Sequence, residues 1–159
     1  MPTREPSASA QLTKSLSRFP TDITALAKRC LPKLRRALPG CHQLVYDYAA
    51  SLVVSFGATD RGHEATVALA VQKDRVLLYV GKDTPDPEGL LGGKGGKVRS
   101  VQLESAAQLD RGPVHELLAA AIARAGSALP REGKTHTIVK SNAARARRRR
   151  APLADEPGA

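Results

Sequence analysis

Residues 65–80, ATVALAVQKDRVLLYV, decide the fold that we predict for this chain. From Ala65 to Gln72, larger apolar residues alternate with small or polar ones, which is the period-two pattern of a half-buried β-strand. A second apolar run, Arg75 to Val80, follows the dipeptide Lys73-Asp74, and a link of two residues permits a tight antiparallel turn. We therefore predict a β-hairpin. The residues expected on its buried face in the first strand are Ala65, Val67, Leu69 and Val71.

Further short runs rich in β-branched and aromatic residues lie on both sides of this hairpin. Gln43 to Tyr48 and Leu52 to Phe56 precede it, and Val98 to Leu103 follows it. A last edge strand is expected within residues 136–140. The pattern predicts a mostly antiparallel sheet of about five strands.

An amphipathic helix is predicted from Thr21 to Leu38, with apolar residues at steps of three and four and basic residues on the other side. Thr21 or Asp22 is the expected N-cap, and Pro39 with Gly40 ends the helix. Pro32 either bends one helix or separates two. Such a basic helix either packs on the sheet, which we favour, or binds a membrane surface or a partner.

A second helix is predicted to begin at Gly112-Pro113, because proline is favoured in the first helical turn. With 159 residues and 42% hydrophobic content, the chain can bury one ordinary core. The predicted fold class is α+β, a single domain over residues 21–130 with the sheet packed against N- and C-terminal helices. Residues 1–20 are expected to form a flexible leader and residues 131–159 a basic, largely disordered tail.

The basic residues are concentrated at the two ends of the chain. Residues 1–38, 39–130 and 131–159 carry formal charges of +6, −1 and +5, which give the net charge of +10. A tail of this kind can bind phosphate backbones without sequence preference, so a nucleic-acid-associated protein is one alternative function. Aromatic residues are only 3% of the chain, which argues against stacking on single-stranded nucleic acid. The arginines that would carry this activity are Arg145, Arg147, Arg148, Arg149 and Arg150.

Four glycines crowd into residues 92–96, beside three cations. Glycine allows positive φ angles, and successive N–H groups in such a turn can form an anion-binding hollow. The spacing does not fit the nucleotide motif GxxxxGK[ST], and no Ser or Thr follows either lysine. We predict a non-enzymatic module that binds a small anionic ligand or a protein partner here, against the alternative of a structural turn. The predicted ligand-binding residues are Gly93, Lys94, Gly95, Gly96, Lys97, Arg99 and Tyr46.

Signatures of catalysis and of metal binding are missing from the sequence. No HExxH or GxSxG motif occurs, and His115-Glu116 is expected to be an exposed pair. Cys30 and Cys41 lack a CxxC or Cys/His context, so neither a structural zinc nor another cofactor is expected. The acidic residues of the segment DTPDPEG either coordinate a hard cation or, as we favour, cap a turn. No secretory or transmembrane run is present, and a cytoplasmic location is the expectation.

Several motifs in order carry a resemblance to a known family. They are YDYAASLVVSFG at 46–57, TPDPEGLLGGKGGKVRSVQLES at 84–105, AAQLDRGPVHELLAAAI at 106–122 and TIVKSNAARARRRR at 137–150. Together they resemble the YdhG-like family, domain of unknown function 1801, from about Ile23 to Arg150. The family pattern has Leu-Leu, one residue, then Gly-Ser-Gly, whereas this chain has Gly92-Gly93-Lys94-Gly95 and lacks the serine.

The resemblance implies an α+β fold with helices packed against an antiparallel sheet. It also implies a further alternative function, frataxin-like iron handling, because one relative is described as an iron chaperone of that type. The acidic residues that this chain offers for such a role are Asp83, Asp86 and Glu88.

Overall fold

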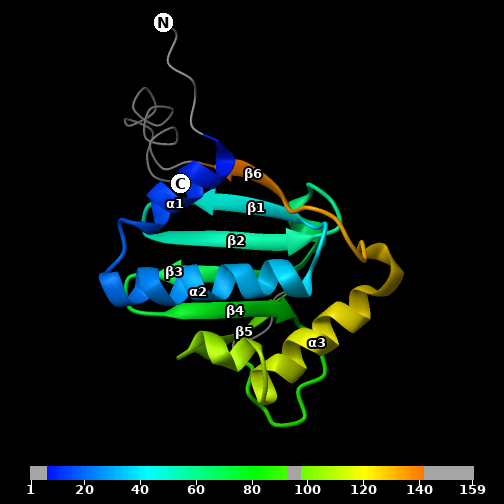
Figure 1. Ribbon diagram of the computed structural model, residues 1–159. Helices are drawn as coiled ribbons and strands as arrows, with labels where there is room; N and C mark the ends of the chain where they lie inside the picture. The colour runs from blue at the N-terminus through cyan, green and yellow to red at the C-terminus, as the bar shows by residue number, and fades with distance from the viewer. Residues whose placement is uncertain (1–6, 93–97, 142–159) are drawn as a thin grey trace, which may run out of the picture.

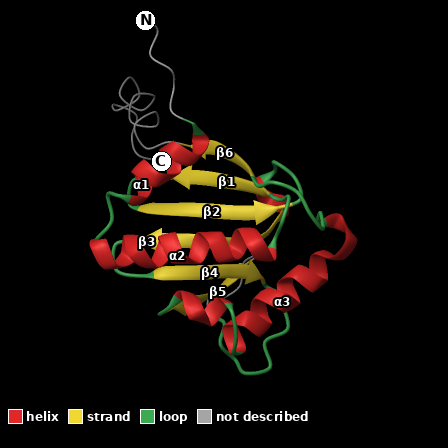
Figure 2. Ribbon diagram, in the orientation of Figure 1, coloured by secondary structure: helices red, strands yellow, loops and turns green. Residues whose placement is uncertain are grey.

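A computed structural model gives the fold of residues 7–92 and 98–141 (Figures 1 and 2). Within these residues the chain forms three α-helices, three short 3₁₀ turns and six strands. The helices are α1 Ala8–Leu16, α2 Thr21–Ala37 and α3 Pro113–Ala125. The 3₁₀ turns are η1 Gly62–Glu64, η2 Ala106–Leu109 and η3 Gly126–Ala128. The strands are β1 His42–Asp47, β2 Ser51–Gly57, β3 Ala65–Gln72, β4 Val76–Gly81, β5 Val98–Leu103 and β6 His136–Ser141.

The six strands make one mixed sheet in the order β5-β4-β3-β2-β1-β6. Strands β1 to β5 pair antiparallel with their neighbours in sequence, as the predicted hairpin pattern requires. At the β3–β4 turn, Gln72 N–H donates to Arg75 O at 2.8 Å across Lys73-Asp74, which confirms the two-residue link. After α3 the chain returns to the far edge, where β6 pairs parallel with β1. The fold is therefore α+β, and the edge strand predicted within residues 136–140 is present as β6, the sixth strand of the sheet.

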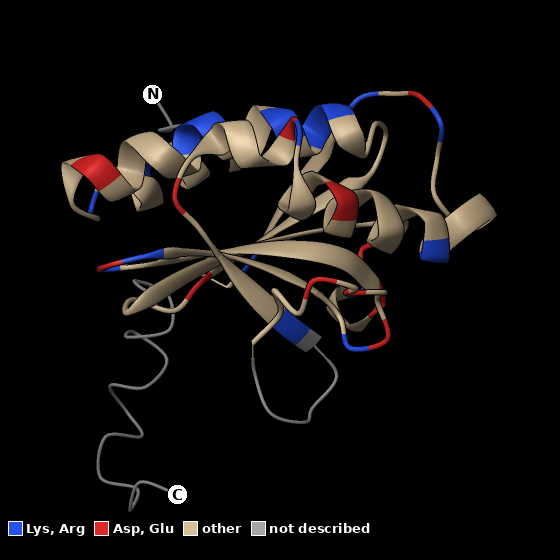
Figure 3. Cartoon of the chain, turned by 90° about the horizontal axis from the view of Figure 1, so that it is seen from below, with Lys and Arg blue, Asp and Glu red and all other residues tan. Residues whose placement is uncertain are grey.

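The helices lie on one side of the sheet, and Figure 3 shows these two layers from the side. Alternate residues of each strand face the helices, so Val54, Leu69 and Leu78 stand side by side on β2, β3 and β4 and are completely buried. Helix α2 contributes its own apolar side to the same cluster. This cluster is the core of the domain. It confirms the alternation predicted for β3 at Val67, Leu69 and Val71, whereas Ala65 is only partly buried and lies outside the cluster.

The expectation of a flexible leader over residues 1–20 is wrong for the residues that the structure describes. Ser7 accepts a hydrogen bond from Ala10 N–H at 3.1 Å and so caps α1. Leu12 and Leu16, one helical turn apart, are each only 2% exposed and join the core, as does Phe19. Three apolar residues among many polar ones are a weak signal for a helix in the sequence. In the folded chain these side chains are buried in the core, and their burial holds α1 on the sheet.

Helix α2 runs through Pro32 without interruption, which settles the choice between one helix and two. Pro32 is exposed, so the hydrogen bond that proline cannot donate is lost on the solvent side of the helix. The N-cap is Pro20 rather than Thr21 or Asp22, which are both helical. Thr24 instead donates its hydroxyl to Leu16 O at 2.7 Å, tying the start of α2 to the end of α1.

The predicted start of the second helix is confirmed, and a side-chain cap orders the turn before it. Gln108 Oε1 accepts from the backbone N–H groups of Glu104 at 2.7 Å and Ser105 at 3.2 Å, which orders η2. Pro113 begins α3 directly after Gly112. Within the described residues, the structure has no helix with the length and apolar character needed to cross a membrane.

Candidate anion-binding site

The structure describes only the two ends of the glycine-rich loop. Gly93, Lys94, Gly95, Gly96 and Lys97 lie outside the described residues. At the base of the loop, Gly92 and Ser100 exchange two backbone hydrogen bonds of 2.7 and 3.1 Å. Arg99 Nη2 donates to Leu91 O at 2.7 Å, so this guanidinium supports the loop backbone.

Tyr46 does not share a concavity with Arg99, contrary to the predicted site. The two residues lie on β1 and β5, which are separated by three strands, or about 19 Å at the usual spacing between strands. They also lie on opposite faces of the sheet. Arg99 pairs across the strands with the core residue Val80, so it lies on the face that carries the helices. Tyr46 lies on the other face, because its neighbours Val45 and Asp47 on β1 point toward the helices.

The Tyr46 hydroxyl lies against Gly62 of η1, on the sheet face without helices. Burial, with Tyr48 stacked alongside at 6.0 Å between ring centres, raises the pKa of the Tyr46 phenol. Tyr46 therefore packs against its own neighbours, and we remove it from the ligand site.

A different set of residues encloses a pocket of about 380 Å³ between α1, α2 and β6, which we call the Arg35 pocket. Its lining combines two cations, four hydroxyl groups and three leucines, and includes no acidic residue. The leucines are each 2% exposed and belong to the core. The lining residues are Ser9, Leu12, Thr13, Leu16, Lys28, Leu31, Arg35, Thr135 and Thr137.

Arg35 is held in this pocket by a partly buried chain of hydrogen bonds. Its Nε donates to Gln43 Oε1 at 2.9 Å, and Gln43 Nε2 donates to Thr137 Oγ1 at 2.9 Å. Gln43 is only 1% exposed and points from β1 toward the helices. Because water cannot reach its side-chain amide, the amide forms its hydrogen bonds with these two partners. These hydrogen bonds link α2, β1 and β6, and they hold Arg35 at Nε.

Arg35 also has no counter-charge among the residues that the structure describes. Within residues 7–92 and 98–141 no carboxylate forms an ion pair with it, although the side chain is partly buried. Burial lowers the pKa of its guanidinium, since an unpaired charge is less stable away from water. In the described structure its hydrogen bond runs through Nε, which leaves both Nη groups for a ligand. A bound anion would supply the missing charge.

Sequence reasoning missed this pocket because its parts come from segments to which we had given other roles. Lys28 and Arg35 are seven residues apart on the basic side of α2, which was assigned to solvent. Ser9 and Thr13 belong to the expected leader, and Thr137 to the expected tail. The spacing of Lys28 and Arg35, two helical turns apart, does place both cations on one side of the helix. This spacing does not reveal which other segments lie beside them.

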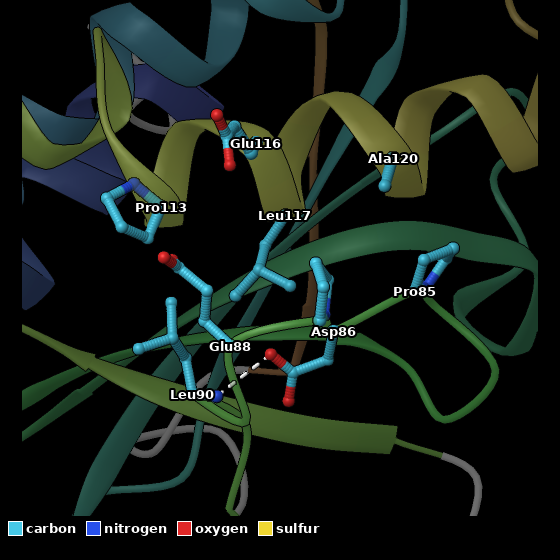
Figure 4. A pocket seen from close by; sticks show the side chains of 9 residues that line it. Pro85, Asp86, Glu88, Leu90, Pro113, Glu116, Leu117 and Ala120 are labelled. Atoms are coloured by element: carbon cyan, nitrogen blue, oxygen red, sulfur yellow. Dashed lines mark hydrogen bonds between the residues drawn. The ribbon is translucent and has the colours of Figure 1, made fainter.

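A second pocket, of about 190 Å³, lies between residues 85–90 and α3 (Figure 4). Leu117 points into it, and Glu88 and Glu116 lie at its sides (Figure 4). Its other lining residues are Pro85, Asp86, Pro87, Leu90, Pro113 and Ala120. This acidic and apolar lining does not suit an anion.

The acidic segment beside that pocket caps a turn, as predicted. Asp86 accepts from Leu90 N–H at 2.8 Å and from Leu91 N–H at 2.9 Å, one bond to each carboxylate oxygen. The bonds from Leu91 and then Leu90 are the main cause of the lowered pKa of this exposed carboxyl. Asp83 Oδ2 lies 4.0 Å from Arg124 Nη2, as an exposed ion pair. In the part of the chain that the structure describes, no three His, Cys, Asp or Glu side chains are grouped to hold a metal ion.

The five arginines of the nucleic-acid alternative, Arg145 and 147–150, lie outside the described residues. Comparisons of the chain with family models, with curated proteins and with solved structures find no match. The resemblance to the YdhG-like family therefore stays a prediction.

Proposed function

We propose that this chain is a non-enzymatic binding module for a small anionic ligand, and that the ligand occupies the Arg35 pocket. The observation that carries the proposal is a partly buried guanidinium, held in place by Gln43, with no carboxylate partner in the described structure. Keeping such a charge away from water costs free energy unless a counter-charge is supplied.

The chemistry of the lining favours a carboxylate or phosphate group. A guanidinium presents its N–H donors in a flat fork that matches two oxygens of either group. Thr135 and Thr137 lie on the β6 side of the pocket and Lys28 at its exposed rim, and their hydroxyl and ammonium groups can donate to the remaining oxygens. The lining holds no histidine, cysteine or carboxylate that would activate a hydroxyl for catalysis.

The test compares two arginines of the same helix. Arg35→Gln removes the pocket charge, whereas Arg29→Gln removes the same charge from an exposed position outside the pocket lining. Calorimetric titration and thermal melting would use inorganic phosphate, acetate and a longer-chain carboxylate. A ligand at a hundred times its Kd should stabilise the wild type by about 2.7 kcal/mol.

We expect Arg35→Gln to weaken binding by about tenfold or more, since it loses a charged bidentate contact, and Arg29→Gln to leave it within about twofold. Arg35→Lys keeps the charge without the fork and should fall between them. Equal losses in Arg35→Gln and Arg29→Gln would indicate diffuse attraction and contradict the pocket.

A double variant of the glycine-rich loop, Lys94→Gln with Lys97→Gln, tests the site that the sequence predicts. If this variant loses anion binding while Arg35→Gln retains it, the loop is the ligand site and the Arg35 pocket is not. If no anion stabilises the wild type, the proposed function itself is wrong.

A further inference from the structure

Two histidines from distant parts of the chain meet on the sheet face without helices. His42 begins β1 and His136 begins β6, and the parallel register pairs them directly. Their ring centres are 5.3 Å apart and the ring planes are tilted by 34°. Their neighbours Gln43 and Thr137 point to the other face, into the network of the Arg35 pocket, so the two sites are separate.

The spacing of the rings suits a shared metal ion. A zinc ion lies about 2.0–2.1 Å from an imidazole nitrogen, and that nitrogen is about 1.1 Å from the ring centre. Two imidazoles on one tetrahedral ion therefore have centres about 5 Å apart, close to the separation seen here.

The hydrogen bonding of the pair leaves a ligand atom uncommitted. His42 Nδ1 is buried, and no described group forms a hydrogen bond with it. Such an atom normally has a partner, because a buried polar group without one costs free energy. His136 is exposed, so its ring can turn to admit an ion.

We propose that His42 and His136 together bind a divalent transition-metal ion of the Zn²⁺, Ni²⁺ or Cu²⁺ class, with water completing the coordination. Imidazole is a preferred ligand for these ions. Strand β6 is an edge strand whose pairing in the described sheet is to β1 alone. The ion would therefore fasten β6 to the sheet across its first residue pair.

The test is calorimetric titration of the full-length protein with Zn²⁺ and with Ni²⁺. His136→Gln and His42→Gln each remove one ligand, while His63→Gln and His115→Gln remove histidines elsewhere as matched controls. Cys41→Ser checks the neighbouring thiol, which is buried on the helix side. We expect a loss of about tenfold or more in each of the first two variants and changes within twofold in the other three.

A second measurement reports on the strand. Metal should slow hydrogen exchange of the β6 amides in the wild type and leave them unchanged in His136→Gln, which alters an exposed residue and so keeps the test valid if His42→Gln does not fold. Wild-type affinity in His136→Gln, or equal losses in all four histidine variants, would overturn the proposal. Anion binding is not required by either readout, so the two proposals stand or fall separately.

Discussion

Replacing Asp47 with asparagine tests how α1 is held on the sheet. Asp47 ends β1 and is 6% exposed. Its carboxylate accepts a hydrogen bond of 2.8 Å from Arg18 Nη1 and one of 2.7 Å from the Ser15 hydroxyl, and it forms an ion pair with Arg18 Nη2 at 2.7 Å. It also accepts from Ala49 N–H at 3.1 Å. One side chain thus joins the end of α1 to the β1–β2 turn.

Asparagine keeps the shape of this side chain but loses its charge and one acceptor. Hydrogen bonds to a charged group contribute about 1.5–3 kcal/mol each. The Arg18 side chain is 30% exposed, so water screens its ion pair with Asp47 and the lower end of that range applies to the hydrogen bond between them. We expect a loss of about 2–3 kcal/mol in the free energy of unfolding, or about 4–12 °C in Tm for a chain of this size.

The assay is urea unfolding followed by circular dichroism, run as a double-mutant cycle with Arg18→Met. A coupling free energy of about 1 kcal/mol or more is expected between the two positions. Asp60→Asn, at an exposed loop position, is the matched control and should change stability by less than about 0.5 kcal/mol. A loss in Asp47→Asn no larger than in the control, or zero coupling to Arg18, would refute this account of how α1 is anchored.

Three further predictions concern the turn, the core and the tail. Ala49 has φ of 67°, a conformation that disfavours a Cβ, so Ala49→Gly should raise the urea midpoint by the equivalent of about 1 kcal/mol. Burial raises the pKa of the Cys30 thiol to about 11, and Lys33 offsets this only partly. The unfolded chain releases that proton near pH 9, whereas the folded chain keeps it up to about pH 11. The free energy of unfolding should therefore fall between pH 9 and 11, and this fall should be smaller in Cys30→Ala. Truncation after Ala143 removes the five tail arginines and should abolish salt-sensitive binding of duplex DNA, measured by fluorescence anisotropy. Because the truncation leaves β6 whole, Tm should not fall. Unchanged binding would rule out the tail as the DNA-binding segment.

Local patterns predicted most of the secondary structure to within one or two residues. The alternation of Ala65 to Gln72 matches β3 at both ends, and Gly112-Pro113 marks the start of α3. These signals depend on neighbours in the chain, because a strand or helix shows its buried side in its own periodicity. Helix α1 escaped prediction because its two buried leucines are too few to establish a period.

The candidate site was hidden from the sequence for a related reason. Gln43 and Thr137 are 94 positions apart, and their hydrogen bond exists only because β6 returns to pair with β1. The same return brings His136 to His42. In the other direction, the tertiary structure separated Tyr46 from Arg99, which we had placed in one site.

The sequence by itself determined the α+β class, the order of the hairpin strands and the helix that covers them, since each follows from spacing among nearby residues. Only the tertiary structure decided which edge receives β6 and which side chains meet in the Arg35 pocket. Closing the long connection from β1 to β6 costs conformational entropy that no single contact offsets. The packing of the whole core stabilises that closure, and so the partners of Arg35 and His42 depend on all of the chain at once.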